Sequence, residues 1–285
     1  MEQFVSYGQN LEDVMLWRAL QGVSKGFYID IGANHPTCDS VTKAFYDRGW
    51  TGINIEPVRS LHERLVAERP RDINLCVAVS AEKGSQPFYE VLETGLSTLD
   101  QGIAEQHATS GHRIARYEVQ VLRMADIFEA HDVGEVHFLK IDVEGAERSV
   151  LSGMPFDRVQ PWIVIVEATR PNSRMPTHQE WESLIVRHGY IDVYFDGVNR
   201  YYLSEQHREL AAAFLTPPNV FDDFVAYPHK LLLEDLAGHK ADLAAHKTLI
   251  ARMQGSWSWR LTRPLRAARA LLQALLKTRG GERDD

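Results

Sequence analysis

The sequence predicts an α/β protein with a mostly parallel sheet, followed by a helical C-terminal extension. Over the first two hundred residues, short β-rich runs alternate with helical patterns, which indicates βαβ units. The β-rich runs are apolar at nearly every position, as expected for strands that are covered on both faces. A length of 285 residues favours one compact domain plus an extension.

The alternation of patterns gives the element order. We predict strands at about 27–32, 52–56, 73–79, 136–142 and 161–167. We predict helices between them at about 38–48, 59–69, 145–153 and 178–188. Gly49 and Gly189 lie just past two of these helices, where a left-handed cap is expected. The runs "YIDVYFDG" and "NRYYLS" predict an antiparallel hairpin that closes one edge of the sheet.

Two further segments set the domain organisation. Residues 84–122 read as an insertion, with strand-like pieces around the polar "GLSTLD", and predict a flap on the substrate side. The proline-punctuated "TPPNVFDDFVAYP" ends the first domain, so we predict domains at 1–228 and 229–285. Residues 229–253 form a helical pattern with a short, weak heptad repeat. A last helix, 264–277, places apolar residues on one face: Leu265, Ala268, Leu271, Leu272, Leu275 and Leu276.

Composition narrows the class of protein. With 44% hydrophobic and 25% charged residues, the chain resembles an ordinary soluble globular protein. The first 30 residues lack an apolar run of signal-peptide length, and no later run is long enough to span a bilayer, so we expect a cytoplasmic protein. Cys38 and Cys76 match no metal or redox spacing and are expected to be core thiols.

Charge is divided unevenly along the chain. The formal net charge is -8, yet seven basic residues and no acidic one lie between Arg252 and Arg279. The body is therefore acidic and the tail basic. An acidic body argues against a nucleic-acid partner, because phosphate contacts need clustered Lys and Arg.

The first two strands end in residues suited to a nucleotide-like cofactor. In a parallel sheet, ligands bind beyond the carboxyl ends of the strands, where "FYIDIGANHP" places Asp30, Gly32 and Asn34. Gly32 is expected to leave room for a ligand against the main chain. Glu56 ends the second strand, where an acid commonly accepts hydrogen bonds from the two hydroxyls of a ribose. A pocket for an adenosine-containing cofactor follows.

The number of glycines after the first strand helps to distinguish a dinucleotide from other adenosine-containing cofactors. A dinucleotide fingerprint has three glycines, but only Gly32 occurs here before Pro36. A cofactor with a cationic amino-acid end, S-adenosyl-L-methionine, would favour nearby acids such as Asp30. We therefore prefer a methyl donor, and a nicotinamide-dependent oxidoreductase acting on nucleotide sugars is the alternative.

More acids gather at the same edge. "FLKIDVEGAE" places Asp142 and Glu144 after the fourth strand, and "IVIVEATRPNS" places Glu167 at the end of the fifth. The alternative is that these acids only cap helices. For Glu147, the last residue of "FLKIDVEGAE", we prefer this capping role.

Taken together, these motifs resemble the FkbM-type S-adenosylmethionine-dependent methyltransferase family. The resemblance covers residues 5–227, and the motifs occur in family order: "SYGQNLEDVMLWRAL", "FYIDIGANHP", "GINIEP", "FLKIDVEGAE", "WIVIVEAT" and "FDGVNRYYL". Pro36 stands where the family commonly has a second glycine. The resemblance implies a Rossmann-like seven-stranded methyltransferase fold and O-methylation, often of sugar hydroxyls.

The resemblance also implies roles for single residues. Asp30, Gly32 and Asn34 would flank the methionine part of the cofactor, Glu56 the ribose and Asp142 the sulfonium side. The "YGQNLED" segment would fold over the cofactor through Tyr7, Gln9, Asn10 or Asp13. Its alternative is a plain amphipathic helix with an asparagine cap.

Transfer of a methyl group to a hydroxyl requires that the hydroxyl proton be removed as the new carbon–oxygen bond forms. Asp142, Glu144 or Glu167 could act as the base, with His178 as a further candidate. Alternatively, Asp142 and Glu167 could share a divalent ion such as Mg²⁺ that lowers the pKa of the hydroxyl. We prefer the version without metal. For the acceptor, the hairpin supplies Asp196, Asn199 and Arg200, which could equally be turn residues.

The tail motif "SWSWRLTRPLR" resembles a short segment near the ends of bacterial glycosyltransferases and related glycan proteins. Leucines beside arginines suit an anionic membrane surface, and docking to a partner or a homo-oligomer is the equal alternative. Our hypothesis is an O-methyltransferase for a sugar of a bacterial surface polysaccharide, such as an O-antigen, or its lipid-linked precursor, peripheral on the inner face of the membrane. The non-enzymatic alternative is a scaffold of glycan-assembly machinery.

Overall fold

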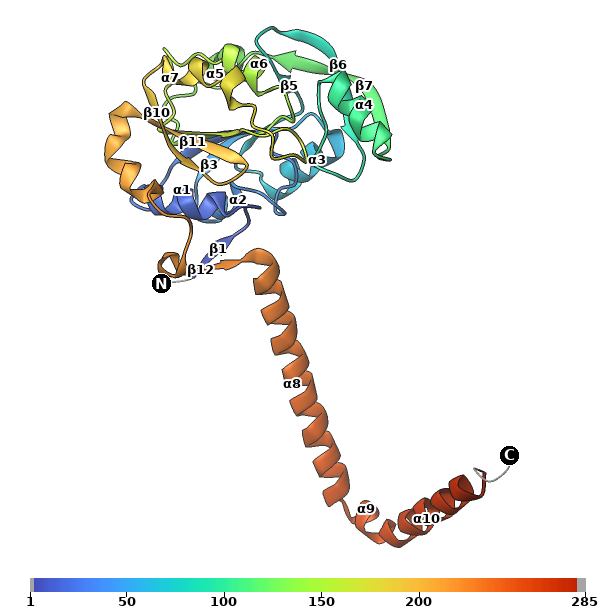
Figure 1. The fold of residues 1–285 in the computed structure, drawn as a ribbon. Helices are drawn as coiled ribbons and strands as arrows, with labels where there is room; N and C mark the ends of the chain where they lie inside the picture. Colours follow the sequence, from blue (N-terminus) through green and yellow to red (C-terminus); the bar gives the residue numbers. More distant parts are fainter. Residues whose placement is uncertain (1–2, 281–285) are drawn as a thin grey trace. The chain divides into compact units, whose positions relative to one another are not determined.

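The structure of the protein is a computed structural model that describes residues 3–280, with side chains described to residue 273. The chain divides into two compact units between Tyr227 and Pro228. The first unit is an α/β domain with a mostly parallel sheet, which confirms the predicted class (Figure 1).

Seven strands form the large sheet of the first unit. From one edge to the other they are β10 (Tyr190–Phe195), β11 (Asn199–Ser204), β9 (Ile163–Glu167), β8 (Phe138–Ile141), β2 (Phe27–Ile31), β3 (Thr51–Ile55) and β4 (Ile73–Leu75). The strands from β4 to β9 pair in parallel, and β11 is antiparallel to both of its neighbours. The predicted edge hairpin is thus present as β10 and β11.

The strand order reverses beside β2. The chain passes from β2 to β3 and β4 at one edge, and then returns to β8 on the other side of β2. The carboxyl ends of β2 and β8 are therefore adjacent at a switch point, where open α/β sheets bind ligands. In this register, Asp30 of β2 is paired with Asn54 on one side and with Lys140 on the other.

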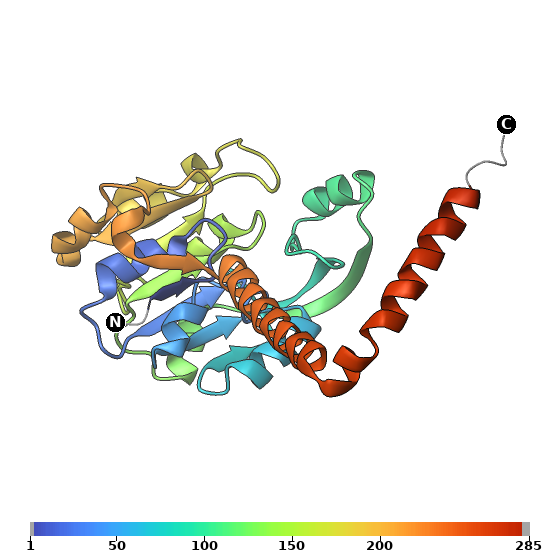
Figure 2. The same cartoon turned by 90° about the horizontal axis from the view of Figure 1, so that it is seen from below.

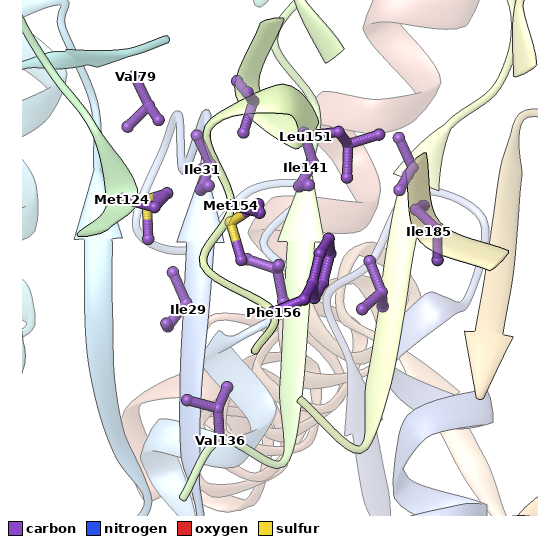
Figure 3. Packing of buried hydrophobic residues seen from close by; sticks show 14 of the residues in the cluster. Ile29, Ile31, Val79, Met124, Val136, Ile141, Leu151, Met154, Phe156 and Ile185 are labelled. Atoms are coloured by element: carbon purple, nitrogen blue, oxygen red, sulfur yellow. The ribbon is translucent and has the colours of Figure 1, made fainter. Parts of the chain in front are cut away.

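Helices cover both faces of the sheet (Figure 1). One layer holds α1 (Glu12–Leu20), α2 (Lys43–Asp47) and the 3₁₀ helix η2 (Glu205–Phe214), and the other holds α5 (Met124–Ala130), α6 (Glu147–Ser152) and α7 (Ser183–Val186). Side chains alternate between these layers, because successive residues of a strand point to opposite faces. Ile29 and Ile31 meet Met124 and Leu151 on one side (Figure 3), while Tyr28 packs on Phe45 and Phe138 on the other.

Some predicted elements are shorter or divided. The helix predicted at 178–188 is the 3₁₀ helix η1 (His178–Glu180) followed by α7, and α3 (Arg59–Glu68) agrees with its prediction. Gly49 and Gly189 have the expected positive φ, 89° and 77°. The strand predicted at 73–79 is confirmed only in its first part, because β4 lies in the large sheet while β5 (Ala78–Val79) joins another.

The predicted insertion forms a separate three-stranded sheet. β6 (Gly84–Val91) and β7 (Ile114–Leu122) are antiparallel, and β5 pairs in parallel with β7. Between them, α4 (Gln101–Thr109) begins at Asp100, whose carboxylate accepts a 2.9 Å hydrogen bond from Ile103 N. Figure 2 shows β6, β7 and α4 projecting from one side of the α/β core.

The two ends of the first unit are joined by a pairing that the sequence did not predict. β1 (Phe4–Ser6) pairs in parallel with β12 (Phe224–Ala226). Arg18 of α1 donates to both carboxylate oxygens of Asp222, at 2.7 and 2.6 Å, next to the 3₁₀ helix η3 (Val220–Asp222). The proline-punctuated stretch is therefore fixed to the first helix.

The two cysteines are exposed, which corrects the prediction of core thiols. Cys38 lies in the loop before α2, and Cys76 lies where the chain leaves β4 for β5. An apolar neighbourhood in sequence did not place these side chains inside, because both segments are connections rather than strand interiors.

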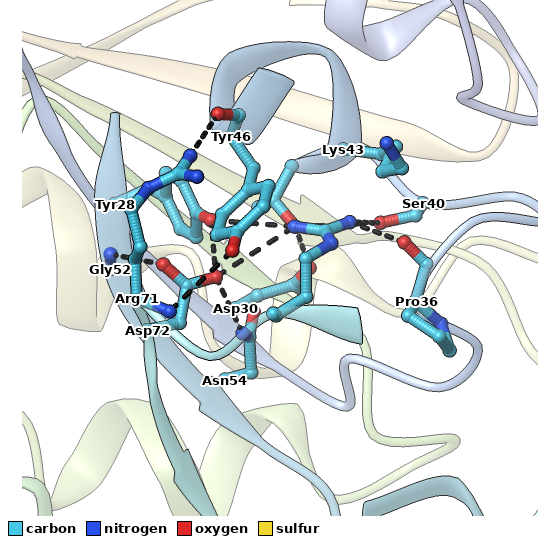
Figure 4. A network of polar contacts seen from close by, with 12 residues as sticks. Tyr28, Asp30, Pro36, Ser40, Lys43, Tyr46, Gly52, Asn54, Arg71 and Asp72 are labelled. Atoms are coloured by element: carbon cyan, nitrogen blue, oxygen red, sulfur yellow. Dashed lines mark hydrogen bonds and ion pairs between the residues drawn. The ribbon is translucent and has the colours of Figure 1, made fainter. Parts of the chain in front are cut away.

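A buried polar network lies beneath the loop that follows β2 (Figure 4). Asp72 accepts hydrogen bonds from Tyr28 Oη at 2.6 Å, Asn54 Nδ2 at 3.0 Å and Gly52 N at 2.9 Å. Arg69 forms an ion pair with Asp72 at 3.8 Å and donates to the carbonyl of Pro36 and to Ser40 Oγ. This network holds the loop 36–40 against the sheet.

The second unit consists of helices α8 (Tyr227–Gly255), α9 (Trp257–Leu261) and α10 (Arg263–Gly280). Helices were predicted at 229–253 and 264–277. The side chains of Leu275 and Leu276, predicted on the apolar face of the last helix, lie outside the described residues. Among the helices that the structure describes, none is both long enough and apolar enough to cross a membrane.

Candidate active site

A cavity of about 250 Å³ lies at the carboxyl ends of β2, β3 and β8. Seven residues that were predicted to bind the cofactor or to act in catalysis line it: Gln9, Asp30, Gly32, Asn34, Glu56, Asp142 and Glu144. Four segments far apart in sequence therefore meet around one space. The parallel sheet explains this, because it brings the carboxyl ends of its strands to a single edge.

Gly32 is required by the fold for a reason that the sequence did not reveal. Its φ is +83°, and a Cβ placed on it would lie 1.8 Å from the carbonyl oxygen of Asp142. The main chain of the loop after β2 thus passes directly against the end of β8. The glycine also lines the cavity, and its role in leaving room for a ligand there stays a prediction.

Glu56 connects two loops at the floor of the cavity. Its Oε2 accepts a 2.8 Å hydrogen bond from Asn34 N, and its Oε1 accepts a 2.7 Å bond from Val58 N. Burial raises the pKa of this carboxyl to about 7, although both hydrogen bonds act in the opposite direction. Each oxygen keeps a second lone pair, so Glu56 can still accept from two hydroxyls of a ligand.

A buried cation, Lys140, lies at the switch point and was not predicted from the sequence. Its Nζ donates to Asp142 Oδ2 at 2.8 Å. Although burial opposes this, Asp142 and Asp30 raise the pKa of Lys140, so its ammonium stays charged. Asp30 Oδ2 accepts from Thr42 Oγ1 at 3.2 Å, while Asp30 Oδ1 has no partner in the part of the chain that the structure describes.

Glu12 is a second residue that the sequence did not single out. It is buried at the start of α1, lines the cavity and accepts a 3.1 Å hydrogen bond from Asn199 Nδ2. Burial raises its pKa to about 7. The signal that could have identified Glu12 is its position in "QNLED", beside the predicted Gln9 and Asn10.

Asp142, Glu144 and Glu167 form an acid cluster at the ends of β8 and β9. One carboxylate oxygen from each lies within 4.8 Å of the others. The buried Oε2 atoms of Glu144 and Glu167 have no hydrogen-bond partner among the described residues. Burial, followed by the charge of Asp142, raises the pKa of both glutamates. The cluster is therefore suited to holding a proton or a cation.

Glu147 has a different task from the cluster. Its Oε1 accepts hydrogen bonds from Val143 N at 3.2 Å and from Gly145 N at 3.1 Å. These bonds close the turn that carries Glu144, whose φ is +53°. The preference for a capping role at Glu147 thus agrees with the geometry.

The insertion forms one wall of the cavity. Thr94, Gly95, Leu96, Ser97 and Leu99 line it. Thr98 Oγ1 donates to the carbonyl of Glu144 at 2.7 Å, and a Cβ on Gly95 would lie 2.8 Å from Asn34 Nδ2. The loop before α4 therefore rests on the segments after both β2 and β8.

Within the "YGQNLED" segment, only Gln9 and Glu12 line the cavity. Tyr7 donates to Asp47 at 3.3 Å and packs against Tyr227, with ring centroids 4.8 Å apart and the ring planes tilted by 34°. Asp13 is buried and accepts hydrogen bonds from Ser6 Oγ and from the amides of Tyr7 and Gly8. Leu11, with φ of 62°, is the N-cap of α1, so the asparagine cap considered for Asn10 is absent.

The predicted acceptor residues lie in the hairpin and not in the cavity lining. Asp196 accepts from Val198 N and Asn199 N, at 2.8 and 2.7 Å, and so closes the turn. Arg200 pairs with Asp192 on the neighbouring strand. His178 lies in η1 and also does not line the cavity. Asn199, which is paired in register with Glu167, is the one that connects the hairpin to the cavity through Glu12.

Acidic residues outnumber basic residues in the lining of the cavity. Six carboxylate side chains line it: Glu12, Asp30, Asp39, Glu56, Asp142 and Glu144. Among the described lining residues, Lys140 is the single Lys or Arg, and it is paired with Asp142. Such a cavity favours a ligand with positive charge and disfavours a pyrophosphate.

Comparison with known protein families is consistent with this chemistry. Residues 30–191 match the methyltransferase FkbM domain, and this segment is more than half of the chain. It contains the carboxyl ends of β2, β3, β8 and β9, and with them most of the residues of the cavity. No curated protein matches the chain. The predicted family is thereby confirmed, and the chain belongs to the FkbM methyltransferase family.

Proposed function

We propose that the protein is an S-adenosyl-L-methionine-dependent O-methyltransferase that acts on a sugar hydroxyl. The observation that carries this proposal is the excess of carboxylates around the cavity at the switch point. A sulfonium and an α-amino group are both cationic, so the lining suits this cofactor better than a dinucleotide. The strand order and the antiparallel hairpin support the finer assignment to a Rossmann-like seven-stranded methyltransferase fold.

The lining residues divide into two ends of one binding site. Glu56 would hold the ribose hydroxyls, next to the loop that carries Asn34. Asp30, with one unpartnered oxygen, and Asp142 would face the cationic end. When bound, S-adenosyl-L-methionine supplies an electrophilic methyl group on a positively charged sulfur.

We assign to Glu144 the role of the base that takes up the proton of the acceptor hydroxyl. This side chain lines the cavity, has a buried unpartnered Oε2 and has a raised pKa, which suits a group that must take up a proton near neutral pH. Glu167 lies behind it in the cluster and would stabilise the proton once it has been transferred.

The alternative is a divalent ion such as Mg²⁺ held by Asp142 and Glu167, with Glu144 as a third carboxylate. Such an ion would relieve the repulsion in the cluster and bind oxygens of the acceptor. Extensive dialysis against a chelator separates the two versions. Full turnover after chelation supports the mechanism in which Glu144 acts as the base without a metal. Turnover that needs added Mg²⁺ supports the mechanism with a bound divalent ion.

The nature of the acceptor rests on sequence rather than on geometry. The tail motif "SWSWRLTRPLR" supports a bacterial surface polysaccharide or its lipid-linked precursor, made at the inner face of the membrane. The same motif supports association with a glycosyltransferase or with the membrane surface.

Calorimetry with S-adenosyl-L-methionine and with NAD tests the cofactor. We expect binding of the methyl donor, weakened in Glu56→Gln, and no binding of NAD. Binding of NAD alone would contradict the proposal and favour an oxidoreductase. Mass spectrometry of surface glycan from a deletion strain then tests the acceptor, because each lost methyl group lowers the mass by one methylene. Cofactor binding with no change in any glycan would favour the scaffold.

A further inference from the structure

Helix α8 presents an apolar line that nothing in its own unit covers. The helix runs for 29 residues, and none of residues 227–255 is buried. Leu236, Leu243 and Ile250 are 49%, 54% and 52% exposed. Helices in proteins owe most of their stability to the packing of an apolar face, so a helix of this length needs a partner along it.

The apolar line follows a heptad repeat. Leu236, Leu243 and Ile250 are seven residues apart and take the a positions. The d positions, three residues further, are Leu232 in the preceding heptad and then His239, His246 and Met253. Three successive a positions are therefore apolar, while two of the four d positions carry histidine. Polar residues in the seam of a coiled coil set register and oligomeric state at a cost in stability.

The charges beside the line have complementary spacing. Asp235 and Asp242 occupy g positions, and Lys240 and Lys247 occupy e positions. Each aspartate precedes one lysine by five residues. In a parallel pair of helices, a g residue faces the e residue that follows five positions later in the partner, so both aspartates meet lysines. In an antiparallel pair, g faces g and e faces e, which sets aspartate against aspartate.

We propose that α8 binds α8 of a second copy of this chain as a parallel two-stranded coiled coil. The occupant is a second copy because the g and e charges of this one sequence complement each other. A membrane surface fits this helix less well, because its flanks carry both signs of charge and lack a continuous basic face. The inference is independent of the proposed enzymatic activity.

Sedimentation of the full-length chain tests the pairing. We expect a dimer, and we expect Leu236→Asp/Leu243→Asp to raise its dissociation constant at least a hundredfold, because two charges would enter the seam of each helix. Ala241→Asp, at the outer f position, is the matched control and should leave the dimer intact. Thermal unfolding of the first unit should be unchanged in both. A monomeric wild-type chain, or a dimer that survives the seam variant, would overturn the proposal.

Charge reversal tests the direction of the helices. Lys240→Asp should weaken the dimer by about three- to tenfold, since it places a new carboxylate against Asp235 of the partner subunit. Asp235→Lys/Lys240→Asp should restore wild-type affinity in a parallel pair. Failure of the double variant to recover affinity would overturn the parallel arrangement.

Discussion

Two groups of charged side chains pack against the strands of the large sheet, and they differ in how well their charges are matched. In the first, Asp72 accepts three hydrogen bonds and has Arg69 beside it. In the second, Asp142, Glu144 and Glu167 crowd together, and Lys140 donates to Asp142 alone.

The difference separates a structural group from a functional one. Burying a charge is costly unless it is paired and hydrogen-bonded. In the first group, the carboxylate of Asp72 and most of the guanidinium donors of Arg69 have such partners. The acid cluster leaves two buried oxygens without a partner among the described residues and therefore destabilises the fold when it is fully ionised. Buried groups with strongly shifted pKa in a cavity are typical of functional sites.

The largest expected effect is on turnover. Glu144→Gln keeps the size of the side chain but removes its ability to take up a proton, so we expect methyl transfer to fall by about a hundred- to ten-thousandfold. Binding of S-adenosyl-L-methionine, measured by calorimetry, should change little. Glu93→Gln, an exposed glutamate paired with Arg113, is the control. Full turnover in Glu144→Gln would remove this residue from the mechanism.

The next effect is on stability. Arg69→Met would leave Asp72 buried without its cation, and we expect a loss of about 3–5 kcal/mol in the free energy of unfolding, measured with denaturant. The control is Arg113→Met, because the exposed Arg113–Glu93 pair should contribute only about 0–1 kcal/mol. Equal losses in the two variants would show that the buried network is not matched as described.

The residues that line the cavity also show what the sequence could predict. Asp30, Asn34, Glu56, Asp142 and Glu144 were predicted because each follows an apolar run, and the carboxyl ends of parallel strands share one edge. That rule needs only local patterns. The rule identifies which residues lie at the carboxyl edge of the sheet, but it does not identify the residues with which they form hydrogen bonds or ion pairs.

What was missed depends on contacts between distant segments. Lys140 pairs with Asp142 and neighbours Asp30 only through strand register. The pairing of β1 with β12 joins two three-residue strands from opposite ends of the first unit, and such short segments carry no periodic signal. The division of 73–79 into β4 and β5 follows from two sheets that compete for one apolar run.

A smaller effect concerns pH. The pKa of Glu167 is raised in the folded state by burial and by Asp142, so the unfolded chain loses this proton at lower pH than the folded one. Above the ordinary pKa the unfolded state binds fewer protons, and stability falls as pH rises towards the raised pKa. Glu167→Gln should remove up to about 1.4 kcal/mol per pH unit of this decline, measured by unfolding from acidic to neutral pH.

The control for this measurement is Glu82→Gln at an exposed position, which should keep the wild-type pH dependence. At pH well below the ordinary pKa of glutamate, Glu167→Gln and wild type should have equal stability. A variant that is less stable than wild type at neutral pH would contradict the view that this cluster is unmatched.

The smallest expected effect is at His178, which was a candidate base in the sequence. The structure places it in η1, outside the residues that line the cavity. We expect His178→Ala to change turnover by no more than about twofold and to leave the pH dependence of the rate in place. A hundredfold loss with unchanged cofactor binding would instead require η1 to move towards the acid cluster during the reaction, and would make the histidine, rather than Glu144, the group that takes the proton.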